Sequence, residues 1–222
     1  QEGLRMLADK KVWTVELSAL RQDELVPLVE NLGELDLDRF KYISFHAPSS
    51  MERSFEPIAL RLLDQVASRG WPIVVHPNAM WTLPNWSHLG DSLCIENMDK
   101  RKPMGQTARD LAYIFDMLPN ASLCFDIGHA RQVDPTMSEA SAILRLFCDR
   151  IRQLHMSEVN TQSKHDCLSL ESILAFQKVA HLVPAETPVI LESKVEESDI
   201  EEEIKSALTA LSTEGLLALA GD

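Results

Sequence analysis

Seven side chains that can bind a metal ion or move a proton follow short apolar segments along this chain. They are His46 in FHAPS, His76 in VVHPN, Glu96 in IENMD, Asp126 and His129 in FDIGH, His155 in LHMSE, and Glu192 in LESK. Imidazole nitrogen combined with carboxylate oxygen suits zinc, manganese, iron or cobalt better than magnesium or calcium, which take mainly oxygen ligands. The series therefore predicts a divalent metal site, in which a carboxylate can also bridge two ions or act as a base.

The segments that precede these residues have the composition of buried parallel strands. They are continuous apolar runs rather than alternating ones, as expected for strands covered on both faces: residues 12–17, 42–45, 72–75, 93–95, 122–125, 151–154 and 189–191. Between them lie segments with helical apolar spacing, at residues 57–68, 108–118, 138–147, 170–179 and 200–211. Strands that alternate with helices predict βαβ units and parallel pairing.

A (β/α)8 TIM barrel explains why the metal-capable residues stand at strand ends. All strands of such a barrel end on one face, so residues far apart in sequence meet there. We expect one domain over residues 1–222. Only seven strands can be counted, residues 3–10 have a helical pattern, and the chain opens with Gln1 instead of Met. We therefore expect the first strand of the barrel upstream of Gln1.

The alternative architecture is a seven-stranded or open doubly wound sheet. However, no glycine-rich phosphate-binding fingerprint follows any predicted strand, so a Rossmann or P-loop fold has little support.

The charge of the chain bears on its partners. It carries 34 acidic against 21 basic residues, a net charge of -13, and this field repels polyanions. A nucleic-acid partner is therefore disfavoured relative to a small molecule.

The 4 cysteines form no CxxC pair, and neither a membrane span nor a signal sequence can be recognised. These features predict a soluble cytoplasmic protein with no membrane partner.

Basic and aromatic residues in the loops after the strands are candidates for substrate binding. Lys100, Arg131 and Lys194 follow Glu96, His129 and Glu192 and would surround the metal face, where they could hold one phosphate or carboxylate. Solvated loop charge is the alternative. Two tryptophans, Trp81 and Trp86, follow His76 and would either stack on a sugar or pack the loop.

The order FHAPS, VVHP, IEN, FDIGH, LHMSE, KHDCL and LES resembles the xylose isomerase-like barrel superfamily, and the resemblance extends from Val12 to Glu192. This superfamily includes sugar isomerases, sugar epimerases and apurinic endonucleases of the endonuclease IV type, all built on an eight-stranded barrel. The resemblance implies one metal site shared by epimerases and endonucleases, with the ligands Glu96, Asp126, His155 and Glu192.

The resemblance also implies further metal sites of the endonuclease type. His46 and His76, with Glu96 bridging, match a second site, and His129 and His165 match part of a third. The endonucleases supply an aspartate two residues before the second of these histidines, where this chain has Ser163. The third site is therefore incomplete.

Two reactions fit this scaffold. The first is that of a metal-dependent sugar or sugar-phosphate isomerase or epimerase, in which Glu96 and Glu192 move a proton beside a metal-bound carbonyl while His129 binds a substrate hydroxyl. The alternative is a phosphoester hydrolase with two or three ions. The acidic charge favours the first, with one to two ions of zinc or manganese. A homo-oligomer is left open, and the complete ligand series argues against a barrel that has lost activity.

Overall fold

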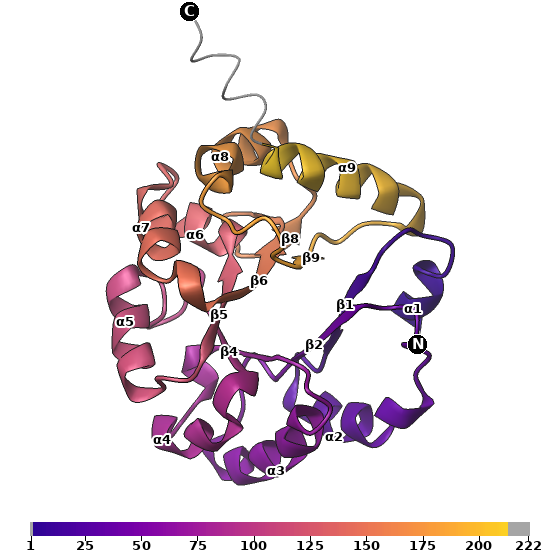
Figure 1. Cartoon of the computed structure of the whole chain (residues 1–222), viewed down its shortest axis with the longest axis vertical. Helices are drawn as coiled ribbons and strands as arrows, with labels where there is room; N and C mark the ends of the chain where they lie inside the picture. The colour runs from indigo at the N-terminus through magenta and orange to yellow at the C-terminus, as the bar shows by residue number, and fades with distance from the viewer. Residues whose placement is uncertain (1, 213–222) are drawn as a thin grey trace, which may run out of the picture.

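The computed structural model describes residues 2–212, in which parallel strands form a ring surrounded by helices (Figure 1). The 7-stranded sheet consists of β1 (Thr14–Ser18), β2 (Tyr42–His46), β3 (Ile73–Val75), β4 (Leu93–Glu96), β5 (Ser122–Asp126), β6 (Ile151–Met156) and β9 (Val189–Leu191). A separate antiparallel pair joins β7 (Glu158–Val159) to β8 (His165–Asp166).

The α-helices are α1 (Glu2–Met6), α2 (Gln22–Glu30), α3 (Glu56–Ala67), α4 (Leu83–Trp86), α5 (Ala108–Met117), α6 (Ile127–Val133), α7 (Ser138–Leu146), α8 (Leu170–Ala180) and α9 (Ile200–Leu211). Short 3-10 helices cover Leu32–Glu34, Arg53–Phe55, Pro77–Ala79, Ser87–Ser92, Cys148–Arg150 and Glu197–Asp199. None of the helices in residues 2–212 is long and apolar enough to cross a bilayer.

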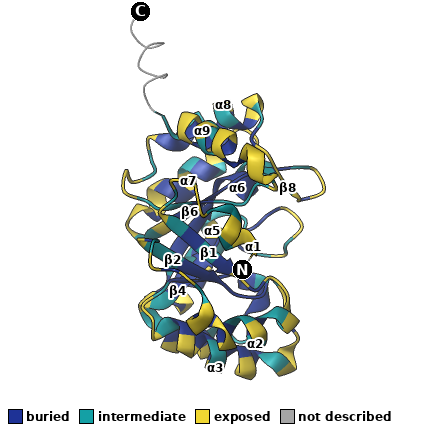
Figure 2. Ribbon diagram, turned by 90° about the vertical axis from the view of Figure 1, so that its right-hand side faces the viewer, coloured by how far each residue is buried: buried dark blue, intermediate teal, exposed yellow. Residues whose placement is uncertain are grey.

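Helix α5 shows how the sequence defines these elements. It begins with a capping box, in which the Thr107 side chain accepts a hydrogen bond from the Asp110 backbone and the Asp110 carboxylate accepts one from the Thr107 backbone. Its inner face buries Leu111, Ile114 and Phe115 against the core. Figure 2 shows the same division throughout the molecule, with exposed residues on the outer faces of the helices and buried residues on the strands.

The strands pair in the order β1-β2-β3-β4-β5-β6-β9, all parallel. The predicted TIM-barrel class is confirmed. The first and last strands approach each other, and the Thr14 hydroxyl donates a 2.9 Å hydrogen bond to the Val189 carbonyl. The expectation of an additional strand upstream of Gln1 stays a prediction.

Side chains two residues before several of the predicted ligands form a layer inside the barrel. Because side chains of a strand alternate between its faces, Val74, Cys94 and Cys124 point to the same side as His76, Glu96 and Asp126. These three pack together as a small cluster separate from the main core. Both cysteines are buried free thiols. On the side of β3, β4 and β5, these three side chains close the barrel beneath the ligands.

Candidate metal centre

The carboxyl ends of the strands bring the predicted ligands together. His46, Glu96 and Asp126 are the last residues of β2, β4 and β5, and they are almost completely buried. The side chains form two groups, and within each group the potential ligand atoms all lie within 4.8 Å of one another. One group is His46, His76 and Glu96, and the other is Glu96, Asp126, His155 and Glu192. These are the two ligand sets that the family resemblance implied.

Glu96 lies at the centre of both groups. Its Oε2 is 3.1 Å from His46 Nε2 and 2.9 Å from His76 Nε2, while its Oε1 is 3.2 Å from His129 Nδ1 and 3.6 Å from His155 Nδ1. Burial would raise the pKa of this carboxyl, but the charge of His76, the hydrogen bond with His46 and the nearby rings of His129 and His155 hold the pKa well below its usual range. Glu96 is therefore an ionised carboxylate enclosed by four imidazoles.

Several polar atoms in the second group have no hydrogen-bond partner among the described residues. They are Asp126 Oδ2, His155 Nδ1 and Glu192 Oε2. A buried polar atom without a partner costs about 1–3 kcal/mol, and more when it is charged. Their lone pairs converge with those of Glu96, and a divalent cation would satisfy all of them at once. The residues therefore fit a metal ion by number, chemistry and position.

Asp126 combines two roles that follow from the FDIGH sequence. Its Oδ1 accepts a 2.7 Å hydrogen bond from the His129 backbone and so caps α6, which leaves Oδ2 for a cation. Burial and the negative charges of Glu192 and Glu96 outweigh the opposing effect of His129 and raise the pKa of Asp126 to about 8.

Gly128 allows the FDIGH turn to lie against the next strand. A Cβ atom at this position would overlap the Ser157 carbonyl oxygen and lie 2.8 Å from Val159 Cγ2. Glycine is therefore needed here for close packing between α6 and the segment that follows β6.

His129 and His165 lie beside the two groups but belong to no ligand group of the described residues. His129 Nδ1 donates to the Asn97 carbonyl at 3.0 Å, so its Nε2 remains available. His165 Nδ1 is 2.8 Å from the Ser157 hydroxyl and 3.4 Å from Glu192 Oε2. The two rings are in edge contact, with centroids 5.4 Å apart.

Hydrogen bonds of Ser163 hold the loop between β7 and β8 in place. Its hydroxyl donates a 2.9 Å hydrogen bond to Asp99, and Arg101 binds both the Asp99 carboxylate and the Ser163 carbonyl. Although Asp99 is buried, these bonds lower its pKa to about 2. The position that carries an aspartate in the endonucleases thus has a structural role here.

The basic residues proposed to surround the site differ in their surroundings. Lys100 and Lys194 are exposed. Arg131 instead pairs with Glu158 at 3.2 Å and with Glu171 at 3.7 Å. Its guanidinium therefore links α6 to the β7 region through these ion pairs. The two exposed lysines are less constrained than Arg131.

The two tryptophans after His76 also differ. Trp86 is fully buried and donates a 2.8 Å hydrogen bond to Glu56, so it packs the loop. Trp81 is 53% exposed and donates to the Met51 carbonyl at 2.8 Å. Trp81 keeps an open face that could contact a ligand, whereas Trp86 does not.

Glu16 was not among the predicted site residues, yet it reaches the ligands from β1. Its Oε2 lies 3.2 Å from His155 Nε2, and it forms a third potential ligand group with His46 and Glu192. The signal was a single carboxylate within the apolar segment VWTVEL. Glu16 was missed because it lies within an apolar segment, whereas the predicted ligands were taken from the residues that follow such segments.

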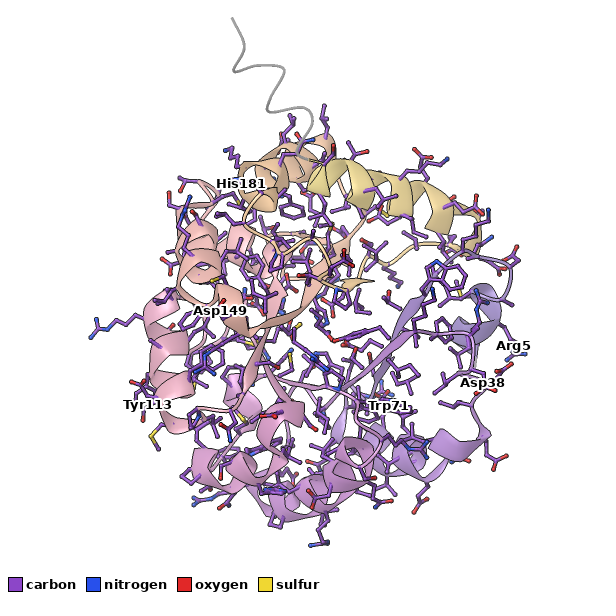
Figure 3. All side chains as sticks on the ribbon, in the orientation of Figure 1. Arg5, Asp38, Trp71, Tyr113, Asp149 and His181 are labelled. Carbon is purple, nitrogen blue, oxygen red and sulfur yellow. The ribbon has the colours of Figure 1, made fainter. Side chains whose placement is uncertain are left out.

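The remaining histidines lie away from the site. His88 pairs with Asp64 on the surface at 2.9 Å. His181 ends α8 at the periphery of the molecule (Figure 3).

The amino-acid sequence of this chain matches a known protein family. A family model described as xylose isomerase-like TIM barrel matches residues 87–213, more than half of the chain. No curated protein sequence matches the chain.

Three solved structures share the fold at low identity. Endonuclease IV from Thermus thermophilus is 15% identical, with a TM-score of 0.62 and coverage of 95% of this chain and 93% of that one. A 3-keto-D-glucoside 4-epimerase from E. coli is 13% identical, with a TM-score of 0.59 and coverage of 94% and 92%. A xylose isomerase-like TIM barrel protein from Mycobacterium smegmatis, in complex with magnesium, is 12% identical, with a TM-score of 0.59 and coverage of 95% and 89%.

These solved structures include both a sugar epimerase and an endonuclease, and at such identity they establish the fold alone. The family model, which covers the segments that contain four of the predicted ligands, establishes the relationship. The chain belongs to the xylose isomerase-like TIM barrel family.

Proposed function

We propose that this protein is a divalent-metal-dependent isomerase or epimerase of a sugar or sugar phosphate. The observation that carries the proposal is the convergence of three unpartnered buried donor atoms, on Asp126, His155 and Glu192, beside the Glu96 carboxylate. One to two ions of zinc or manganese suit this mixture of nitrogen and oxygen ligands.

A cation bound there would polarise a substrate carbonyl and acidify the adjacent C–H bond. Glu192 is the carboxylate that a substrate can reach, since 20% of its side chain is exposed against 1% for Glu96. Burial alone would raise the pKa of Glu192, but the charge of His155, whose Nδ1 lies 3.3 Å from Glu192 Oε1, lowers it below its usual range. Glu192 is thus ionised and able to accept the proton.

Glu96 and His129 are the two buried residues that we propose to act on the substrate together with Glu192. Glu96 faces the substrate position from a different strand and would serve as the opposing carboxylate. His129 keeps Nε2 free because Nδ1 is bonded to Asn97, and this nitrogen would bind a substrate hydroxyl. Lys100, Lys194 and Trp81 would contact the distal part of the substrate, with Arg131 holding the surrounding segments.

A metal-dependent phosphoester hydrolase is the second candidate. The group of His46, His76 and Glu96 favours it, because proton transfer beside a carbonyl needs one ion, whereas hydrolysis of this type uses two or three. The net charge of -13 opposes binding to duplex DNA, which requires many contacts from lysine and arginine.

Metal analysis of the full chain purified without chelator, combined with two activity probes, distinguishes the candidates. The isomerase proposal expects one to two ions per chain and incorporation of deuterium from D2O next to the carbonyl of a ketose or ketose phosphate, followed by NMR. Cleavage of bis-p-nitrophenyl phosphate without deuterium incorporation, in protein that holds two or more ions, would favour the hydrolase. No bound metal after expression with added zinc or manganese would overturn both.

Replacement of Glu192 by Gln should weaken metal binding and abolish turnover while folding is retained. The amide keeps the shape but neither binds a cation as strongly nor accepts a proton. Calorimetric titration with Mn²⁺, the deuterium assay and circular dichroism measure the three effects. Glu196→Gln, which changes an exposed carboxylate four residues further on, is the matched control. Full activity of the Glu192 variant would show that its assignment is wrong.

A further inference from the structure

A hydrogen-bonded network lies behind the metal ligands, on the inner side of β1, β2 and β6. Glu16 Oε2 is its centre: it accepts from the Ser44 hydroxyl at 2.8 Å and from Gln153 Nε2 at 2.7 Å, and it lies 3.2 Å from His155 Nε2. The Tyr42 hydroxyl donates to Gln153 Oε1 at 2.8 Å and so fixes the amide that holds Glu16. The carboxylate is thus held from several sides in the barrel interior.

The two ring nitrogens of His155 face different surroundings. Nδ1 points into the predicted metal group, 3.3 Å from Glu192 Oε1 and 3.6 Å from Glu96 Oε1, and it has no hydrogen-bond partner among the described residues. Nε2 points toward the network. An imidazole that binds a cation through Nδ1 carries its proton on Nε2, and that proton needs an acceptor.

Glu16 is the acceptor that the network provides. The other polar atom near His155 Nε2 is Gln153 Nε2 at 2.7 Å, an amide donor that cannot accept a proton because Gln153 Oε1 already receives the Tyr42 hydroxyl. A proton on His155 Nε2 therefore requires this amide to direct its N–H group to Glu16 Oε2, which lies 2.7 Å from it, and not to the imidazole. Glu16 is only 4% exposed, and within residues 2–212 its one ion-pair partner is His155. The electrostatic interaction of a buried carboxylate with its single charged partner is strong, because little solvent screens the pair.

We propose that Glu16 is a positioning residue of the metal centre. It accepts the Nε2 proton of His155, which selects the tautomer whose Nδ1 binds the cation and fixes the orientation of the ring. Ser44, Gln153 and Tyr42 keep the carboxylate in place. The inference rests on the proposed function, because it assumes that the group containing His155 binds a divalent ion.

Glu16→Gln in the full chain tests this role, with Glu56→Gln as the matched control. Glu56 is also a buried carboxylate, 3% exposed, but it accepts from Trp86 and from the Thr82 backbone, away from the ligands. Removal of a partner of a ligating histidine typically weakens metal binding about 10–100-fold. We expect a loss of that size in Zn²⁺ affinity, by competition with a chromophoric chelator, at unchanged stoichiometry. Glu56→Gln should leave the affinity unchanged.

A spectroscopic measurement separates positioning from a general effect on folding. In zinc-loaded wild-type protein labelled with ¹⁵N-histidine, His155 should be protonated at Nε2 with a strongly downfield proton. In Glu16→Gln this proton signal should move upfield. Should the Gln variant fail to fold, Glu16→Asp keeps the charge but withdraws the carboxylate by one methylene, and a smaller loss of affinity is expected.

The outcomes distinguish this inference from the proposed function. If wild-type protein binds no divalent metal, the proposed function fails. If wild type binds metal but Glu16→Gln shows the same affinity and the same His155 spectrum, the positioning role is overturned. Loss of one ion per chain, with unchanged affinity for the rest, would also overturn it and make Glu16 a direct ligand alongside His46 and Glu192.

Discussion

Substitution of Glu96 by Gln should remove tight binding of divalent cations from both ligand groups at once. Glu96 belongs to both, and its two oxygens lie within 3.6 Å of four imidazoles. Loss of a direct ligand should exceed the roughly 10–100-fold cost of losing a residue that only orients one. Zn²⁺ and Mn²⁺ titrations on protein stripped of metal would measure the affinity, and the deuterium-exchange assay should show no turnover.

Asp99→Asn is the matched control for this variant. Asp99 lies three residues further along the chain and its side chain is only 2% exposed, but it binds Arg101 and Ser163 and belongs to none of the ligand groups of the described residues. Metal affinity should be retained in this control. Equal losses in both variants would mean that the loop after β4, rather than the Glu96 carboxylate, determines binding.

Gly128→Ala should destabilise the protein by about 3 kcal/mol, the upper part of the usual range for overpacking. Alanine normally favours a helix over glycine by about 1 kcal/mol, which would oppose the loss. The added methyl group, however, would overlap the Ser157 carbonyl oxygen, a backbone atom that cannot rotate away, and would crowd Val159. Thermal unfolding followed by circular dichroism should show a Tm lower by roughly 6–12 °C.

Gly33→Ala provides the comparison, because a Cβ atom there would meet nothing within 4 Å. Its Tm should be close to that of wild type. Gly128→Ala should also weaken metal binding, since the displaced turn carries Asp126 and His129 on either side. Wild-type stability and metal affinity in Gly128→Ala would contradict the role of close packing in this turn.

The sequence predicted the strands well because apolar segments mark them directly. The segment at residues 189–191 agrees with β9, whereas β2, β4 and β5 continue one residue further, through His46, Glu96 and Asp126. The apolar pattern stops where a ligand begins, but the backbone pairing does not. The convergence of these ligands could be predicted because parallel strands end on one face.

Other features depend on contacts that no local pattern reveals. Helix α6 was not predicted because its sequence contains Gly128 and begins directly after β5, with the candidate ligand Asp126 as its cap.

The helix dipole alone would account for the acidic residues at the start of α9, yet Glu203 is buried. It accepts hydrogen bonds from the Leu168 backbone and the Ser193 hydroxyl. Contacts with the loops that cover it thus bury one residue of an otherwise exposed charged run.

The shared position of Glu96 has a thermodynamic consequence. Two ions that bind through one carboxylate cannot bind independently, so occupancy of the His46–His76 group must change the affinity of the Asp126–His155–Glu192 group. By linkage, the second ion changes the affinity for the first by the same factor. A metal titration should therefore depart from the isotherm of independent sites, and the metal supply would set which single-ion and two-ion forms coexist.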